Sequence, residues 1–177
     1  MPFARWLISW AMIAILVAAI AENAAGQASS NKDNSDNAVP VNVLEKHFFE
    51  AIRAGNAQDV LSYVSKDGVN IGQDAQHTSQ DAVEQQFAAH QDLYCRLFDS
   101  SCIKAPIDLA NSGRTCSYRE LLTRSKEVRT AGSAMTRSGV RQAILVARIK
   151  NDECPNQTLI DFVFNLQADG WKLFSIP

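Results

Sequence analysis

Histidine and tyrosine side chains supply the candidates for acid–base chemistry or ligand binding in this sequence. A histidine titrates near neutral pH, and a tyrosine hydroxyl can donate a hydrogen bond to a ligand oxygen. His47 lies beside the apolar stripe of one predicted helix, and His90 shares the stripe of another with Tyr94. All three, like Tyr63, also fit the edge of a hydrophobic core. We therefore name His47, Tyr63, His90 and Tyr94 as candidate ligand-binding residues and no residue as catalytic.

Arg148 and Asp161 form the one candidate for an acid–base couple. They lie at similar distances along the chain from Cys154, which predicts that they face each other across a hairpin. A structural ion pair, which stabilises a sheet by about 0.2 to 1 kcal/mol, is the more common role for such residues. The sequence contains neither a Gly-rich phosphate loop nor a G-x-S-x-G nucleophile motif, so it indicates no cofactor.

The four cysteines of the chain are Cys95, Cys102, Cys116 and Cys154. Because there is no C-x-x-C pair and no neighbouring histidine, two disulfides are favoured over a zinc site, and we predict no metal. Four cysteines allow three pairings, and the spacing does not choose among them. Of the three we favour Cys95 with Cys102 and Cys116 with Cys154.

The start of the chain has the order of features that marks a secretory signal peptide. One arginine within residues 1–5 precedes an apolar segment over residues 6–21, and small residues follow. We predict a signal peptide over residues 1–26 and a disordered linker over residues 27–38. The mature protein is then periplasmic or secreted, with no stable membrane span after cleavage; an uncleaved membrane anchor is the alternative.

Composition predicts one globular domain over residues 39–177. The chain has 177 residues, of which 46% are hydrophobic and 20% are charged, and this is enough to bury one core. The net charge is -2 and no run of basic residues is present, so we expect no nucleic-acid partner.

The elements that must position the candidate residues begin with two helices that meet at a corner. Apolar residues recur at helical spacing over residues 43–53 and again over residues 57–65. Gly55 separates these two helices and ends the first. A short strand is predicted over residues 69–72.

One long helix is predicted next. Thr78 or Ser79 caps its start, and apolar or aromatic side chains continue at helical spacing far beyond the cap. This makes it the longest predicted helix of the domain. The residues of its stripe are Val83, Phe87, His90, Tyr94 and Leu97.

A cysteine-containing insert over residues 99–126 separates the helices from a predicted sheet. Ser117 and Glu120 in the insert match a capping box, which predicts a short helix over residues 118–125. The sheet that follows is predicted from strand-forming residues and turn signals, including Asp169-Gly170. Its predicted strands cover residues 127–135, 140–150, 158–167 and 171–176.

Three segments resemble the nuclear transport factor 2-like superfamily, which includes the SnoaL-like and ketosteroid-isomerase-like proteins. They are FFEAIRAGNAQDVLSYVSKDGVNIG at residues 48–72, TSQDAVEQQF at 78–87 and the closing ADGWKLFSI. The resemblance implies an α+β fold in which a curved, cone-shaped antiparallel sheet wraps round three helices and encloses an apolar cavity. Members include isomerases, dehydratases, polyketide cyclases, ligand binders and interaction modules, so the fold does not set the function.

The expected function is an exported domain that binds a small apolar molecule or a partner, without catalysis. One alternative is a lyase or isomerase that acts on a small apolar substrate through His90 and a carboxylate or tyrosine. Another is an exported inhibitor or immunity-type protein. A cavity with converging polar side chains at its base would favour an enzyme, whereas an apolar or filled cavity would favour binding or a structural role.

A homodimer is expected from the pattern of the strand over residues 158–167. Its even-numbered apolar residues point to the core, which leaves Val163 on the other face of the sheet. The neighbouring strand places Ile144 and Val146 on the same side, and such an apolar patch on an outer sheet face is typical of a subunit contact. The alternative is that the insert over residues 99–126 covers the patch within one chain.

Overall fold

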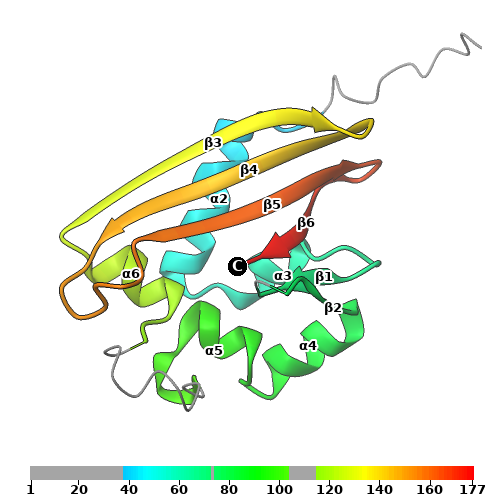
Figure 1. Cartoon of the computed structure of the whole chain (residues 1–177). Coiled ribbons are helices and arrows are strands. Elements are labelled where there is room, and N and C mark those ends of the chain that lie inside the picture. The colour runs from blue at the N-terminus through cyan, green and yellow to red at the C-terminus, as the bar shows by residue number, and fades with distance from the viewer. Residues whose placement is uncertain (1–37, 73, 104–114) are drawn as a thin grey trace, which may run out of the picture. The chain divides into compact units, whose positions relative to one another are not determined.

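The computed structural model of the chain describes residues 38–72, 74–103 and 115–177. These belong to one compact unit, Asn37–Pro177. They have an α+β fold, as the sequence predicts (Figure 1). The predicted signal peptide and nearly all of the predicted linker lie outside the described residues.

Six strands form one open sheet in the order β2-β1-β6-β5-β4-β3. They are β1 (Val69–Ile71), β2 (Gln76–Thr78), β3 (Glu127–Arg137), β4 (Val140–Lys150), β5 (Leu159–Gln167) and β6 (Gly170–Ile176). All neighbouring pairs are antiparallel except β1 and β6, which are parallel. The prediction of a wholly antiparallel sheet is therefore wrong at this pair, because the long connection between β1 and β6 permits a parallel crossover that no tight turn could make.

Helices pack on one side of the long strands. The helices are α2 (Val41–Ala54), α3 (Ala57–Ser62), α4 (Gln80–Ala88), α5 (Leu93–Phe98) and α6 (Tyr118–Arg124), with a 3₁₀ turn, η2 (Ser100–Cys102). α2 crosses β3, β4 and β5 on the side that we call the inner face; the opposite side is the outer face (Figure 1). A side-chain carbon at Gly132 of β3 would lie 2.8 Å from Val41 of α2, so this close approach requires glycine.

Three helix boundaries occur where the sequence predicts them. Gly55 ends α2 with a φ of 72°, in the left-handed region that glycine tolerates best. Ser79 caps α4 by accepting a hydrogen bond from the N–H of Ala82. Ser117 and Glu120 form the predicted capping box at the start of α6. These local signals fix where the helices begin and end.

The predicted long helix is wrong, because α4 ends at Ala88 and α5 begins at Leu93. Between them His90 and Asp92 have φ values of 53° and 43°, and left-handed residues cannot continue a right-handed helix. The side chain of Gln86 accepts a hydrogen bond from the N–H of Leu93 at 3.2 Å, which stabilises the break. The longest described helix is instead α2, with 14 residues.

The predicted alternation along β5 is confirmed. Ile160, Phe162 and Phe164 are buried on the inner face, whereas Asp161 and Val163 on the outer face are only partly buried. Side chains of a strand alternate between the two faces of its sheet, so β5 contributes one face to the core and one to the surface. β4 pairs with β5 in the register that places Ile144 opposite Val163.

Both favoured disulfides are confirmed: Cys95 with Cys102 and Cys116 with Cys154, with no free cysteine. Disulfides of this kind form and persist in oxidising compartments.

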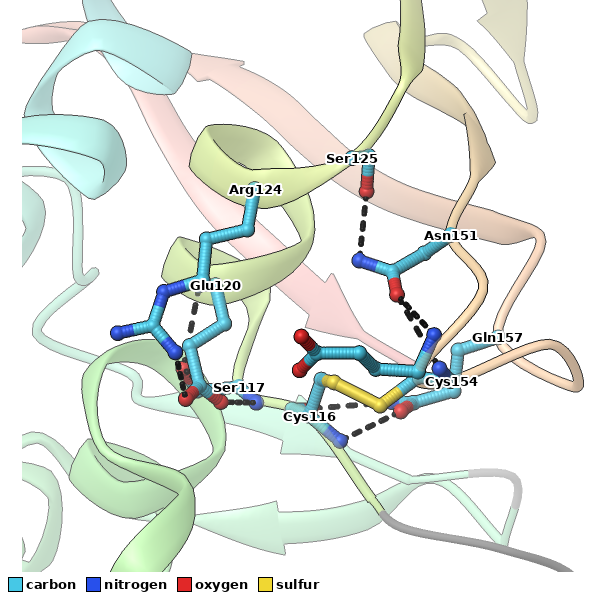
Figure 2. Close-up of a disulfide and its surroundings, with 9 residues drawn as sticks. Cys116, Ser117, Glu120, Arg124, Ser125, Asn151, Cys154 and Gln157 are labelled. Atoms are coloured by element: carbon cyan, nitrogen blue, oxygen red, sulfur yellow. Dashed lines mark hydrogen bonds and ion pairs between the residues drawn. A yellow bond between two sulfur atoms is a disulfide. The ribbon is translucent and has the colours of Figure 1, made fainter.

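Hydrogen bonds surround the Cys116–Cys154 bridge and hold the end of the insert to the connection between β4 and β5 (Figure 2). The side chain of Gln157 accepts from the N–H of Cys116 at 2.7 Å and donates to its carbonyl at 3.1 Å. Asn151 accepts from the N–H of Cys154 at 3.1 Å and donates to the Ser125 hydroxyl at 2.9 Å. The bridge therefore lies where the insert contacts the β4–β5 connection, and the polar side chains of Gln157 and Asn151 beside it are hydrogen-bonded.

Replacing Cys116 and Cys154 together by alanine should lower the free energy of unfolding by about 4 kcal/mol, because the bridge closes a sequence separation of 38. The matched replacement of Cys95 and Cys102, which are separated by 7, should cost about 2.4 kcal/mol on the same chain-entropy account. Urea denaturation followed by circular dichroism measures both losses. A larger loss for the shorter loop would contradict this prediction.

Candidate functional site

Aromatic rings fill the space between α2 and the sheet. Phe48 of α2 makes edge-to-face contacts with Phe162, Phe164 and Tyr63, at centroid distances of 4.8, 5.0 and 5.4 Å. The side chains of Phe48, Phe162 and Phe164 are 0% exposed. The protein's own side chains therefore occupy the interior between α2 and β5, where a ligand cavity would need empty volume.

Tyr118 of α6 connects this aromatic cluster to Pro177. Its ring lies 5.7 Å from that of Phe162, and its hydroxyl donates a hydrogen bond to the Pro177 carbonyl at 3.0 Å. Arg96 donates to the same carbonyl at 2.6 Å. Burial raises the pKa of Tyr118 to about 12; the Arg96 guanidinium opposes this increase and the Asp161 carboxylate adds to it. A phenol that remains protonated to this pH suits a structural donor rather than a general base.

His47 and Tyr63 lie together, as two of the four predicted ligand-binding residues. They line an open groove of about 440 Å³ between α2 and α3, to which Glu50 and Asp59 also contribute. His47 is exposed and Tyr63 is partly buried. Burial and, to a smaller extent, the Asp59 carboxylate raise the pKa of Tyr63. The groove thus offers an imidazole, a phenol and two carboxyl groups to a polar ligand.

His90 and Tyr94, the other two predicted residues, stack on each other elsewhere. Their rings are 4.2 Å apart and inclined by 10°. His90 is exposed at the break between α4 and α5, and Tyr94 is partly buried against Phe87 and Phe98. Neither residue lines the groove of His47 and Tyr63. The structure therefore brings the four residues together as two separate pairs, and a ligand-binding role for either pair stays a prediction.

Arg148 and Asp161 do not face each other, contrary to the sequence prediction. In the β4–β5 ladder Arg148 lies opposite Leu159, and Val146 lies opposite Asp161. The ladder is centred on the peptide between Glu153 and Cys154. Arg148 would face Asp161 only if the centre lay one peptide later, between Cys154 and Pro155, because moving the centre by one residue changes each partner by two. Among the described residues no ion pair joins Arg148 to Asp161. The acid–base couple is therefore not formed.

The outer face of the sheet carries an apolar patch, which we call the β4–β5 patch and define as Ile144, Val146 and Val163. Ile144 and Val163 are a cross-strand pair, and all three side chains are only partly buried. α2 packs on the opposite face and α6 packs on α2 (Figure 1). Leu159, at the start of β5, is 56% exposed on the same outer face. The sequence pattern predicts this patch, although not the exposure of Leu159.

The two helical elements of the insert contact other helices. η2 contacts α5, and α6 contacts α2 and α5. The rest of the insert, residues 104–114, lies outside the described residues. The described parts therefore favour the inner side of the domain over the β4–β5 patch.

A further open groove was missed by sequence reasoning. It has a volume of about 810 Å³ and is lined by side chains of both signs of charge, among them Lys66, Asp67, Glu84, Asp169 and Lys172. The Lys172 ammonium group lies 3.1 Å from the Asp169 carboxylate, which lowers the pKa of Asp169. Residues from three separate segments form this groove, so no local sequence signal could have found it.

Clusters of metal ligands and membrane-spanning helices are both absent from the described residues. No three His, Cys, Asp or Glu side chains in them are placed to hold a metal ion together. None of the helices in that part of the chain is long and apolar enough to cross a membrane.

Stability should fall between about pH 10 and pH 12, because Tyr118 has a pKa near 10 when unfolded and about 12 when folded. In that window the unfolded state releases a proton that the folded state retains, so rising pH favours unfolding. Absorbance titration near 295 nm should find Tyr118 ionising last of the three tyrosines. Tyr118→Phe should remove that late step and reduce the loss of stability; an unchanged titration in the variant would contradict the assignment.

No protein-family model, curated protein or solved structure matches this chain in the comparisons that were made. The geometry of the described residues therefore provides the basis for inferring its function.

Proposed function

We propose that this chain is an exported, non-catalytic interaction domain with a nuclear transport factor 2-like fold. The observation that carries the proposal is the filled interior, in which Phe48, Phe162 and Phe164 are 0% exposed. A lyase or isomerase with an interior site would need a cavity that positions polar groups around a substrate. An interaction domain needs only a stable core and an accessible surface, and both are present.

The order of elements supports the fold assignment. Two helices that meet at Gly55 precede a short strand pair, more helices and then four long strands in an antiparallel meander. This order agrees with the sequence segments that resemble the superfamily. The cone shape and the wrapping of the sheet round three helices belong to the proposal, as does membership of the superfamily.

Export is supported by two independent features. The signal-like pattern at the start of the sequence predicts secretion or transport to the periplasm. Both disulfides fit the oxidising environment of such a compartment.

The β4–β5 patch is the surface best suited to a protein partner. Its apolar centre is bordered on the outer face by Arg148, Asp161 and Asn165, and an apolar centre with a polar rim is the usual composition of an interface. The partner is a second copy of the chain, as the sequence pattern suggests, or a target protein, as for an inhibitor or immunity-type protein.

A small ligand is the second candidate, and the groove of His47 and Tyr63 supports it. Its volume of about 440 Å³ falls within the range of ligand pockets. However, the groove is open and His47 is exposed, so it would hold a polar molecule at the surface rather than enclose an apolar one.

Native mass spectrometry of the protein purified from an exporting host tests the absence of an interior ligand. We expect the mass of the processed, doubly disulfide-bonded chain, alone or in a protein complex, because aromatic side chains fill the described interior between α2 and β5. A retained stoichiometric small molecule would contradict the proposal and would identify a ligand class.

Val163→Asp tests the β4–β5 patch, because a carboxylate at its centre must be desolvated in any contact. If the partner is a second copy, sedimentation at about 50 µM should find a dimer that this variant weakens at least about tenfold. Val39→Asp is the matched control, since Val39 is an exposed valine elsewhere, 49% accessible. Equal behaviour of the two variants would argue against the patch.

A further inference from the structure

β3 forms one edge of the sheet. Among the described residues it pairs only with β4, and this pairing runs without a bulge over all 11 residues of the strand. Every residue from Ala131 to Arg137 is exposed. The opposite edge, β2, has only 3 residues. A long edge with free backbone N–H and C=O groups is a template for another strand.

The usual protections of an edge strand are absent from β3. Natural edges carry prolines, bulges or inward-pointing charges that prevent pairing. β3 contains no proline, and its charged residues are Glu127, Arg129 and Arg137, all near its ends and all on the outer face. The middle of the strand has small, uncharged side chains, so a second backbone can approach it closely.

We propose that β3 pairs with β3 of a second copy of this chain, antiparallel and about a two-fold axis through Gly132. A two-fold contact uses the same surface on both copies, so the residues at equal distances from Gly132 become partners. Glu127 then lies opposite Arg137 of the second copy, and Arg129 lies opposite Met135 of that copy. The symmetry repeats each pairing, which gives two Glu127–Arg137 pairs.

Charge selects this register over its neighbours. A shift by one residue of the axis towards Ser133 would place Arg129 opposite Arg137, which is repulsive. A shift towards Ala131 would leave no opposite charges facing each other. Within the described residues Arg137 has no ion-pair partner, whereas Glu127 pairs with Arg129 of its own strand. The contact would therefore provide Arg137 with a carboxylate.

The arrangement has a geometric consequence. In an antiparallel pair, facing side chains point to the same side, so the helices of both copies lie on one side of the joined sheet. Both β4–β5 patches then lie on the other side and remain accessible. This contact differs from the face-to-face dimer that the sequence pattern suggests, and it does not depend on the proposed function. Because it buries little area, we expect a dissociation constant in the micromolar range.

Charge reversal at the two ends of β3 tests the proposal. Sedimentation velocity over a concentration series, on the disulfide-bonded protein, should show a dimer that Arg137→Glu or Glu127→Arg weakens at least about fivefold, because both pairs become repulsive. The controls Lys46→Glu and Glu50→Arg change the charge equally at exposed sites of α2 and should leave the dimer unchanged. Circular dichroism verifies folding, and Arg137→Glu is the cleaner variant because Glu127→Arg also breaks the pair with Arg129.

Recombining the charges is the decisive step. The double variant with Glu127→Arg and Arg137→Glu should dimerise again, and a mixture of the two single variants should form a heterodimer in which both pairs are opposite in charge. Hydrogen exchange should slow in residues 127–137 as the concentration of the wild-type protein rises.

Three results would overturn the proposal. One is a wild-type monomer at several hundred micromolar, roughly the upper end of the expected dissociation range. The second is a dimer that Val163→Asp splits and that charge reversal leaves intact. The third is slow exchange in β3 that does not depend on concentration, which would mean that the chain covers its own edge.

Discussion

The packing of Phe48 against β5 is the interaction on which the rest of this structure depends. Its ring joins α2 to Phe162 and Phe164, and edge-to-face geometry lets the rings interlock without empty volume. Replacing a buried phenylalanine by alanine typically lowers the free energy of unfolding by about 3 to 5 kcal/mol. This is a large fraction of the roughly 5 to 15 kcal/mol that stabilises a whole domain. These rings fill the space between α2 and β5, and the grooves, the outer sheet face and the strand edge lie outside it.

A second constraint closes the inner side of the domain. The capping box of α6, the Cys116–Cys154 bridge and the hydrogen bonds of Gln157 fix the end of the insert to the β4–β5 connection. Tyr118 and Arg96 both bind the Pro177 carbonyl, which ties α6 and α5 to the last strand. A disulfide and hydrogen bonds thereby hold α5, α6 and the β4–β5 connection around an apolar centre. These contacts do not involve the β4–β5 patch on the outer face.

Local signals in the sequence predicted most elements, because capping residues, a glycine corner and strand alternation act over a few residues. The break at His90 could not be predicted, since it depends on the dihedral angles of two non-glycine residues and on a hydrogen bond between Gln86 and Leu93. The β4–β5 register could not be predicted, because the packing of the connecting loop decides which residues of the two strands face each other. The four candidate residues that the sequence indicates lie in two separate pairs. Whether such residues come together depends on the tertiary fold, which no local pattern specifies.

The central claim is that the described interior between α2 and β5 has no room for a ligand. Titration of the disulfide-bonded protein with a small apolar probe such as indole, followed by chemical shifts of the buried aromatic rings, tests it most directly. The account predicts no saturable shift at the rings of Phe48, Phe162 and Phe164, because their side chains are 0% exposed and in mutual contact. Saturable, stoichiometric shifts at those rings would contradict it and would show that the interior opens to a ligand.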